Sequence, residues 1–207
     1  MKRIIFLLVI LTGAITAGAI TATEAFTSAP ASIFPLLDKS TRLDMVDYYN
    51  SGSSTQSKNK LSGKARVYAI SSRDLRFTAS NASTCQVAVL DYGDSEIIAL
   101  IETVATPAPD SNISFYTSDW QKLDKKCFET PQLKQWLTDA GQDNVDLVEM
   151  LMPFMLVGYE YDAESKLLTL TNNVKEFLSE DIYEQIAPYL RDKLVYRWTG
   201  KRMELVK

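Results

Sequence analysis

The sequence predicts an α+β fold in which antiparallel sheet meanders carry short helices, and the order of the elements allows two similar lobes. Three observations support this prediction. Apolar and polar residues alternate over many short segments that are separated by polar turns, as in half-buried antiparallel strands. Helical spacing of apolar residues is confined to short stretches. The chain has 207 residues and 46% hydrophobic composition, which is enough to bury a substantial core.

The N-terminus has the layout of a secretory signal peptide. Met1–Arg3 is basic, Ile4–Ile20 is apolar and uncharged, and small residues follow. We expect cleavage after Ala19 or after Ala25, which makes the protein exported, either periplasmic or extracellular. No later segment is long and apolar enough to span a membrane, so we expect no span after signal cleavage.

The first half of the mature chain predicts one helix followed by strands. The apolar segment Ile33–Leu37 is interrupted by proline and is interpreted as an extended plug on the core, and Thr41–Asn50 has helical spacing. Asn50–Ser62 is interpreted as a polar loop. The expected strands are Arg66–Ile70, Leu75–Ala79, Cys85–Asp91, Glu96–Val104, Asn112–Tyr116 and Trp120–Leu123, with the sheet broken at Thr106–Asp110. The strand Glu96–Val104 is expected to be central and covered on both faces.

The second half predicts helices and two hairpins. A helix should begin at Thr130-Pro131 and stop at Gly141, a second should run from an Asp143 cap to Pro153, and a third should follow Ser179. The hairpins pair Met155–Tyr161 with Leu167–Thr171, and Lys193–Trp198 with Arg202–Val206. The expected organisation is a signal peptide at 1–25, an N-terminal unit at 26–128 and a C-terminal unit at 129–207, the last two alternatively forming one continuous domain.

The composition excludes several kinds of chemistry. The net charge of −4 does not suit a nucleic-acid binder, and the absence of histidine removes most triads and most catalytic zinc sites. We therefore assign no catalytic, cofactor-binding or metal-binding residue, and expect no cofactor. Acidic groups at Asp91–Glu96, Asp44 with Asp47, and Glu160 with Asp162 are interpreted as turn and surface carboxylates, with calcium binding or acid–base catalysis as the alternatives.

Cys85 and Cys127 are a candidate disulfide, because exported proteins with an even number of cysteines form such bonds. The alternative is two separate buried thiols, since Cys85 alternates with Val87 and Val89 on the inner face of a strand. Neither cysteine lies in a metal-binding or redox motif.

Aromatic residues gather on several expected strands and form a candidate interaction surface: Tyr116, Trp120, Tyr159, Tyr161, Tyr196 and Trp198. If exposed, they would stack on sugars or peptides, and if buried, they form cross-strand core pairs, which is the interpretation that we favour. The residues expected to be almost fully buried are Leu75, Phe77, Val87, Ile98, Leu100 and Ile186.

Several local motifs are similar to those of one known family. These motifs are Ser32–Leu37, Arg42-Leu43-Asp44 with Asp47, Asp110-Ser111, Phe115-Tyr116, Asp119-Trp120 and Lys122-Leu123. Over nearly all of the mature chain, the sequence resembles a Bacteroidales-restricted family of exported proteins that is described only as a domain of unknown function. The resemblance implies a Gram-negative envelope or secreted context and supplies no catalytic residues.

These observations together favour a non-enzymatic, exported interaction module whose partner is an envelope protein or a glycan. Two alternatives stay open: a carboxylate-dependent hydrolase such as a glycosidase, and an inhibitor-like envelope protein. Two carboxylates facing each other in a deep cleft would favour the hydrolase.

Overall fold

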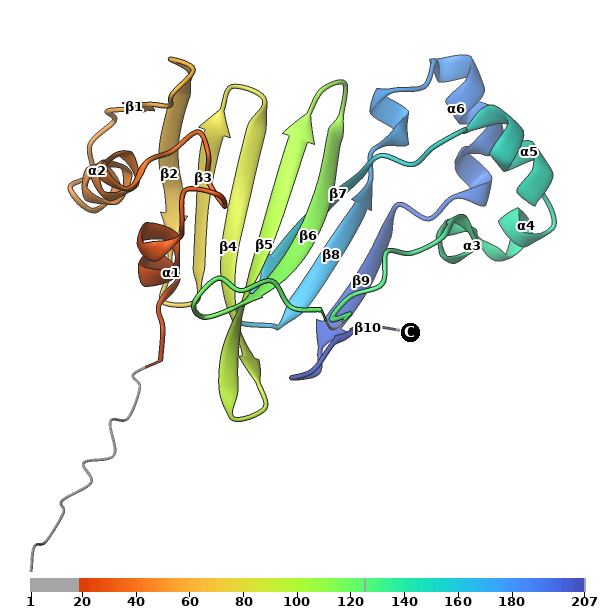
Figure 1. Cartoon of the computed structure of the whole chain (residues 1–207). Helices are drawn as coiled ribbons and strands as arrows, with labels where there is room; N and C mark the ends of the chain where they lie inside the picture. Colours follow the sequence, from red (N-terminus) through yellow and green to blue (C-terminus); the bar gives the residue numbers. More distant parts are fainter. Residues whose placement is uncertain (1–18, 125, 207) are drawn as a thin grey trace, which may run out of the picture.

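The computed structural model describes residues 19–124 and 126–206, and over this part the chain forms two antiparallel sheets with short helices (Figure 1). The large sheet has the strand order β1-β2-β3-β4-β5-β6, and the small sheet has the order β10-β9-β8-β7. The expected α+β class is confirmed. Residues 1–18, which include the basic part and most of the apolar part of the expected signal peptide, lie outside the described residues.

The strands of the large sheet are β1 (Ser57–Lys58), β2 (Lys64–Ile70), β3 (Asp74–Ser80), β4 (Ser83–Tyr92), β5 (Ser95–Ala105) and β6 (Pro109–Thr117). Those of the small sheet are β7 (Val157–Asp162), β8 (Leu167–Asn172), β9 (Lys193–Trp198) and β10 (Met203–Leu205). Each of these except β1 was expected from sequence within a few residues. Alternation of inward and outward residues locates strands well because it follows directly from the pleat.

The helices are α1 (Ala22–Ser28), α2 (Lys39–Asn50), α3 (Leu133–Trp136), α4 (Asp139–Gln142), α5 (Val145–Leu151) and α6 (Glu180–Ile186), with 3-10 turns at η1 (Val174–Glu176) and η2 (Ala187–Tyr189). Helix α2 begins two residues before the expected Thr41 and is capped by Asp38, whose carboxylate accepts from the Thr41 amide at 2.8 Å. Helix α5 is preceded by Asn144 at its N-cap, one residue after the expected Asp143.

Two expectations for the end of the large sheet are wrong. The proline-containing segment Thr106–Asp110 does not break the sheet, because Ala105 pairs with Pro109 and the two strands continue as a hairpin. Proline is tolerated there because it starts an edge strand. Trp120–Leu123 is not a strand: Trp120 has a φ of 65°, and a single bridge joins Tyr116 to Lys122.

The prediction of one helix up to Gly141 is also wrong, because this segment forms two separate short helices, α3 and α4. Thr138 caps α4 by accepting from the Gly141 amide at 3.2 Å. Gly141 lies inside α4, where a Cβ atom would approach the Tyr189 carbonyl oxygen to 2.3 Å. Glycine is required for this close approach of η2 rather than for a helix stop.

The large sheet is covered on both faces. One face of β3, β4 and β5 packs against α1 and the segment around Phe34, in a cluster that includes Leu75, Phe77 and Leu100. The other face packs against the small sheet, where Phe115 stacks on Trp198 with ring centroids 6.1 Å apart. A third apolar cluster joins α5, η1 and α6 at the far end of the small sheet (Figure 1). The prediction that β5 is covered on both faces is confirmed, and β5 is an interior strand that lies next to the edge strand β6.

The residues expected in the core are buried as predicted, with exposed fractions of 0–1% for Leu75, Phe77, Val87, Ile98, Leu100 and Ile186. The disulfide is not formed. Cys85 belongs to the cluster on the α1 side of the large sheet, whereas Cys127 belongs to the cluster on the small-sheet side. Because the sheet lies between the two thiols, the bond is sterically excluded.

Strand β7 is an edge of the small sheet, and side chains of the large sheet bind its outward backbone groups. The Gln86 amide accepts from the Tyr161 N–H at 3.1 Å and donates to the Tyr161 carbonyl at 2.6 Å. Ser111 accepts from the Tyr159 N–H at 3.0 Å, and Asp110 accepts from the Val157 N–H at 3.1 Å. These bonds satisfy an edge that would otherwise be open to further strand pairing.

Candidate functional site

A cleft of about 530 Å³ lies where the small sheet leaves part of the large sheet uncovered. Its floor comes from β2 to β6, and one wall comes from the edge strand β7. The lining residues are Tyr68, Arg76, Thr84, Cys85, Gln86, Ile101, Thr103, Ala105, Pro109, Ser111, Gly158, Tyr159, Glu160, Thr171 and Asn173. Hydroxyl, amide and aromatic groups dominate this set, and the volume is in the range of small-molecule sites.

Arg76 is the central charged group of the cleft. Its Nε atom lies 2.8 Å from Asp74, its Nη1 atom pairs with Glu160, and its Nη2 atom donates to the Tyr161 carbonyl at 3.1 Å. Burial alone would lower the pKa of Arg76, but the hydrogen bonds and charges of Glu160 and Asp74 outweigh it and raise the pKa. Both carboxylates are therefore held by one guanidinium, so the charge of Arg76 is fully paired and the group of three carries one excess negative charge.

Two tyrosines supply the aromatic walls. Tyr68 projects from β2 with 43% of its surface exposed, and Tyr159 projects from β7 and is half-buried. Burial raises the pKa of both phenols above the ordinary value. Both hydroxyls therefore stay neutral at physiological pH and can donate and accept hydrogen bonds.

Backbone and amide groups give the cleft its shape. Asn173 is 8% exposed and donates from its amide to the Pro109 carbonyl at 2.6 Å. A Cβ at Gly158 would approach the Asn173 amide nitrogen to 3.0 Å, so glycine makes room for this contact. The Thr103 and Ser111 hydroxyls are hydrogen-bonded at 2.7 Å. The polar groups are thus ordered before any ligand arrives, which reduces the entropic cost of binding.

The structure does not bring the aromatic candidate surface together. Four of its members are only 2–6% exposed and belong to the interior: Trp120, Tyr161, Tyr196 and Trp198. For these four, the interpretation as core pairs is confirmed and the alternative of an exposed stacking surface is wrong. The Trp120 indole donates to the Ala25 carbonyl at 3.0 Å, and the Trp198 indole donates to the Asp91 carbonyl at 2.7 Å.

The other two candidates are half-buried and lie apart. Tyr116 packs against Trp120 on the α1 side of the large sheet, with ring centroids 5.2 Å apart, whereas Tyr159 lines the cleft. Sequence reasoning missed Tyr68, Arg76 and Gln86. The available signal was Gln86, a polar residue inside the otherwise apolar run of β4.

The acidic groups noted in the sequence serve structural roles. Asp91 and Glu96 are paired across the β4–β5 hairpin, and both bind Arg73. Asp44 and Asp47 are exposed on α2, and Glu160 binds Arg76. Among the described residues, no cluster of three or more Cys, Asp and Glu side chains is placed to hold a metal ion.

Comparisons with known proteins identify the fold and a family. A family model described as "Protein of unknown function (DUF3256)" matches residues 14–203. A solved structure, described as a domain of an uncharacterized protein from Porphyromonas gingivalis W83, is 23% identical with a TM-score of 0.76, and the match covers 91% of this chain and 98% of that one. No curated protein matches the chain. None of the described helices has the length and hydrophobicity needed to cross a membrane.

Proposed function

The chain belongs to the DUF3256 family of proteins of unknown function, and from that premise we propose that it is an exported, non-enzymatic protein that binds a glycan in the cleft between its two sheets. Export is supported by the basic and apolar leader of the sequence. Binding is supported by the lining of the cleft, which is the observation that carries the proposal.

Sugar rings have apolar C–H faces and a rim of hydroxyl groups. The exposed ring of Tyr68 and the half-buried ring of Tyr159 offer flat surfaces for the C–H faces. Hydroxyl groups such as those of Thr84 and Thr171 offer donors and acceptors for the rim. Sequence alone left a protein or a glycan as the partner, and this lining favours the glycan.

The charges of the cleft argue against an anionic ligand and against hydrolysis. Arg76 is matched by Glu160 and Asp74, so an added ionic group would displace an existing pair. A glycosidase needs one carboxyl group that can protonate the leaving oxygen and a second that acts as base or nucleophile. Here both candidate carboxylates are paired with the same guanidinium, Arg76.

The proposal is tested by calorimetry of the purified mature protein with maltohexaose, cellohexaose, laminarihexaose and chitohexaose. We expect saturable binding of at least one of them, and at least about tenfold weaker binding after Tyr68→Ala, because a stacked aromatic anchor is lost. Tyr49→Ala is the matched control, since Tyr49 is similarly exposed, at 37%, and lies on α2 outside the cleft.

Three outcomes would contradict the proposal. The first is the absence of binding to all four glycans, and the second is an equal effect of the Tyr68 and Tyr49 variants. The third is release of shorter sugars, detected by mass spectrometry, that stops in Glu160→Gln, which would indicate the hydrolase. Binding of an unstructured peptide at the cleft without any glycan binding would indicate a protein partner.

A further inference from the structure

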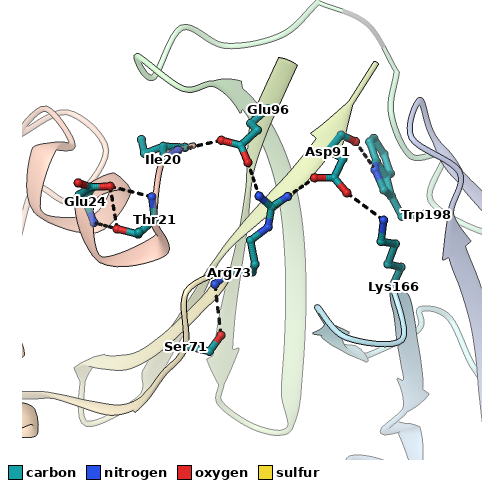
Figure 2. Close-up of polar contacts among 9 residues, drawn as sticks. All are labelled: Ile20, Thr21, Glu24, Ser71, Arg73, Asp91, Glu96, Lys166 and Trp198. Carbon is teal, nitrogen blue, oxygen red and sulfur yellow. Dashed lines mark hydrogen bonds and ion pairs between the residues drawn. The ribbon is translucent and has the colours of Figure 1, made fainter. Parts of the chain in front are cut away.

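In the described part of the chain, the N-terminal segment contacts the large sheet at Ile20. The backbone nitrogen of Ile20 donates to Glu96 Oε2 at 2.8 Å, and the Ile20 side chain packs against the cluster on the α1 side of the large sheet (Figure 2). The preceding residue, Ala19, is exposed. One of the two expected cleavage sites, after Ala19, therefore falls at the boundary between an exposed residue and a docked one.

The other expected site, after Ala25, falls inside a helix that belongs to the core. Ala22 and Ala25 are fully buried, and the Ala22 amide donates to the Ser72 carbonyl at 2.9 Å. The Ala25 carbonyl accepts the buried Trp120 indole N–H at 3.0 Å. Cleavage there would remove these contacts and leave a buried donor without its acceptor, which is costly.

The carboxylate that Ile20 binds belongs to a chain of ion pairs, and an amide nitrogen at Ile20 adds no charge to that chain. Glu96 binds Arg73, which also binds Asp91 at 2.5 Å, and Asp91 binds Lys166 at 2.9 Å (Figure 2). Next to Ile20, Glu24 accepts from the Thr21 amide at 2.8 Å and closes a capping box at the start of α1. This hydrogen bond lowers the pKa of Glu24, so it stays ionised.

The ion pairs link two carboxylates, Asp91 and Glu96, to two cations, Arg73 and Lys166, and Glu24 adds a third carboxylate beside Thr21 (Figure 2). A free ammonium group at Ile20 would add the third cation at the one position already within hydrogen-bond distance of Glu96. Charge-assisted hydrogen bonds of this kind are stronger than those from a neutral amide.

We propose that the Ala19–Ile20 bond is the processing site of this protein, and that the new α-ammonium group of Ile20 forms an ion pair with Glu96 in the mature fold. An envelope signal peptidase catalyses the attack of water on the Ala19 carbonyl. The C–N bond breaks, the carboxylate stays on Ala19, and the Ile20 nitrogen leaves as an amine that takes up a proton. Ala17 and Ala19 provide the small residues that such peptidases require before the cleaved bond.

The first test is the N-terminus of the exported protein. The full chain, with its own leader, is expressed in a Gram-negative host, and the protein recovered from the periplasm or medium is analysed by N-terminal mass spectrometry. We expect Ile20 as the first residue. Any other N-terminus, including Phe26 or intact Met1, would overturn the proposal.

The second test is the pKa of the Ile20 amine, followed in the processed protein by the pH dependence of its acylation. Glu96 from β5 contacts this nitrogen, Arg73 from the β2–β3 turn binds the other oxygen of Glu96, and Glu24 from α1 binds the neighbouring Thr21. The direct contact with Glu96 should raise the pKa of the amine above the ordinary value of about 7.7–8.0. Glu96→Gln should make acylation near neutral pH faster by about tenfold, which corresponds to one pKa unit.

Asp91→Asn is the matched control, because it also removes a carboxylate from Arg73 but does not touch Ile20. Equal acylation rates in the Glu96 and Asp91 variants would overturn the ion pair. If Glu96→Gln does not fold, one alanine added before Ile20 in the processed chain restores the amide donor and moves the ammonium away. That chain should unfold at a temperature lower by a few degrees, and an unchanged midpoint would overturn the ion pair as well.

Discussion

Gln86 is the residue whose replacement tests how the two sheets are joined. It lies on β4, is 6% exposed, and its side-chain amide makes three hydrogen bonds. Two of them go to the backbone of Tyr161 on the edge strand β7, and the third goes to Asp74 at 2.6 Å. Gln86→Met keeps the length of the side chain and removes all three bonds.

The magnitude follows from which partners are left without a substitute. The Tyr161 N–H loses its acceptor inside the protein, which costs about 1–3 kcal/mol. The Tyr161 carbonyl keeps the bond from Arg76, and Asp74 also keeps its pair with Arg76, so each of these losses is about 0.5–1.5 kcal/mol. We expect the free energy of unfolding to fall by about 2–6 kcal/mol in total.

The assay is urea unfolding followed by circular dichroism, together with thermal melting. A chain of this size should melt about 4–24 °C lower, at about 2–4 °C for each kcal/mol lost. Gln185→Met is the matched control, because Gln185 is exposed on α6 and donates only to the Asp181 carbonyl, and its effect should stay within about 0.5 kcal/mol. Equal losses in the two variants would refute the inference that Gln86 fastens β7 to the large sheet.

Four further predictions follow from single groups. Ile98→Ala and Leu100→Ala should each lower the free energy of unfolding by about 2–5 kcal/mol in urea titrations, because both leave cavities in the central strand, and a loss below about 1 kcal/mol would contradict its assigned burial. The intact mass should not change on reduction, and a gain of two hydrogen atoms would instead show a disulfide between Cys85 and Cys127. Iodoacetamide should modify Cys85 only after unfolding, because burial raises the pKa of the Cys85 thiol to about 12. The hydrogen bond from Lys166 lowers the pKa of Asp91 below 3.8, so this pair should stabilise the fold above that pH and cease to do so as the pH falls through the lower folded pKa. Asp91→Asn should flatten this small part of the dependence of unfolding free energy on acidic pH, and an unaltered dependence would contradict the assignment. Calcium added after a chelator should leave the melting temperature unchanged, whereas a rise would point to a cation site at the β4–β5 turn.

The strands show how far local patterns predict this fold. Leu75 and Phe77 point to one side of β3 and Arg76 to the other, and that alternation is visible in the sequence because it is set by the pleat within one strand. The division of the helix at Thr138 is not visible, because it depends on η2, whose Tyr189 carbonyl approaches Gly141 from nearly fifty residues away along the chain.

The candidate site was less predictable than the strands. Tyr159 was singled out from its aromatic pattern, but Trp120, Tyr161 and Trp198 have the same pattern and are buried. Aromatic spacing gives the same signal for a core pair and for a binding surface, because both place rings on one face of a strand. Which face is covered depends on where the small sheet packs.

The sequence by itself determined the strands, most of their turns, the apolar core of β3 to β5 and the export-like leader, since each of these is encoded by neighbouring residues. Tertiary structure alone decided the rest. It placed Cys85 and Cys127 on opposite faces of one sheet, brought Arg76 to Glu160, and set Ile20 against Glu96. These partners are more than forty residues apart, and no local periodicity records which distant segments the packing of two sheets brings into contact.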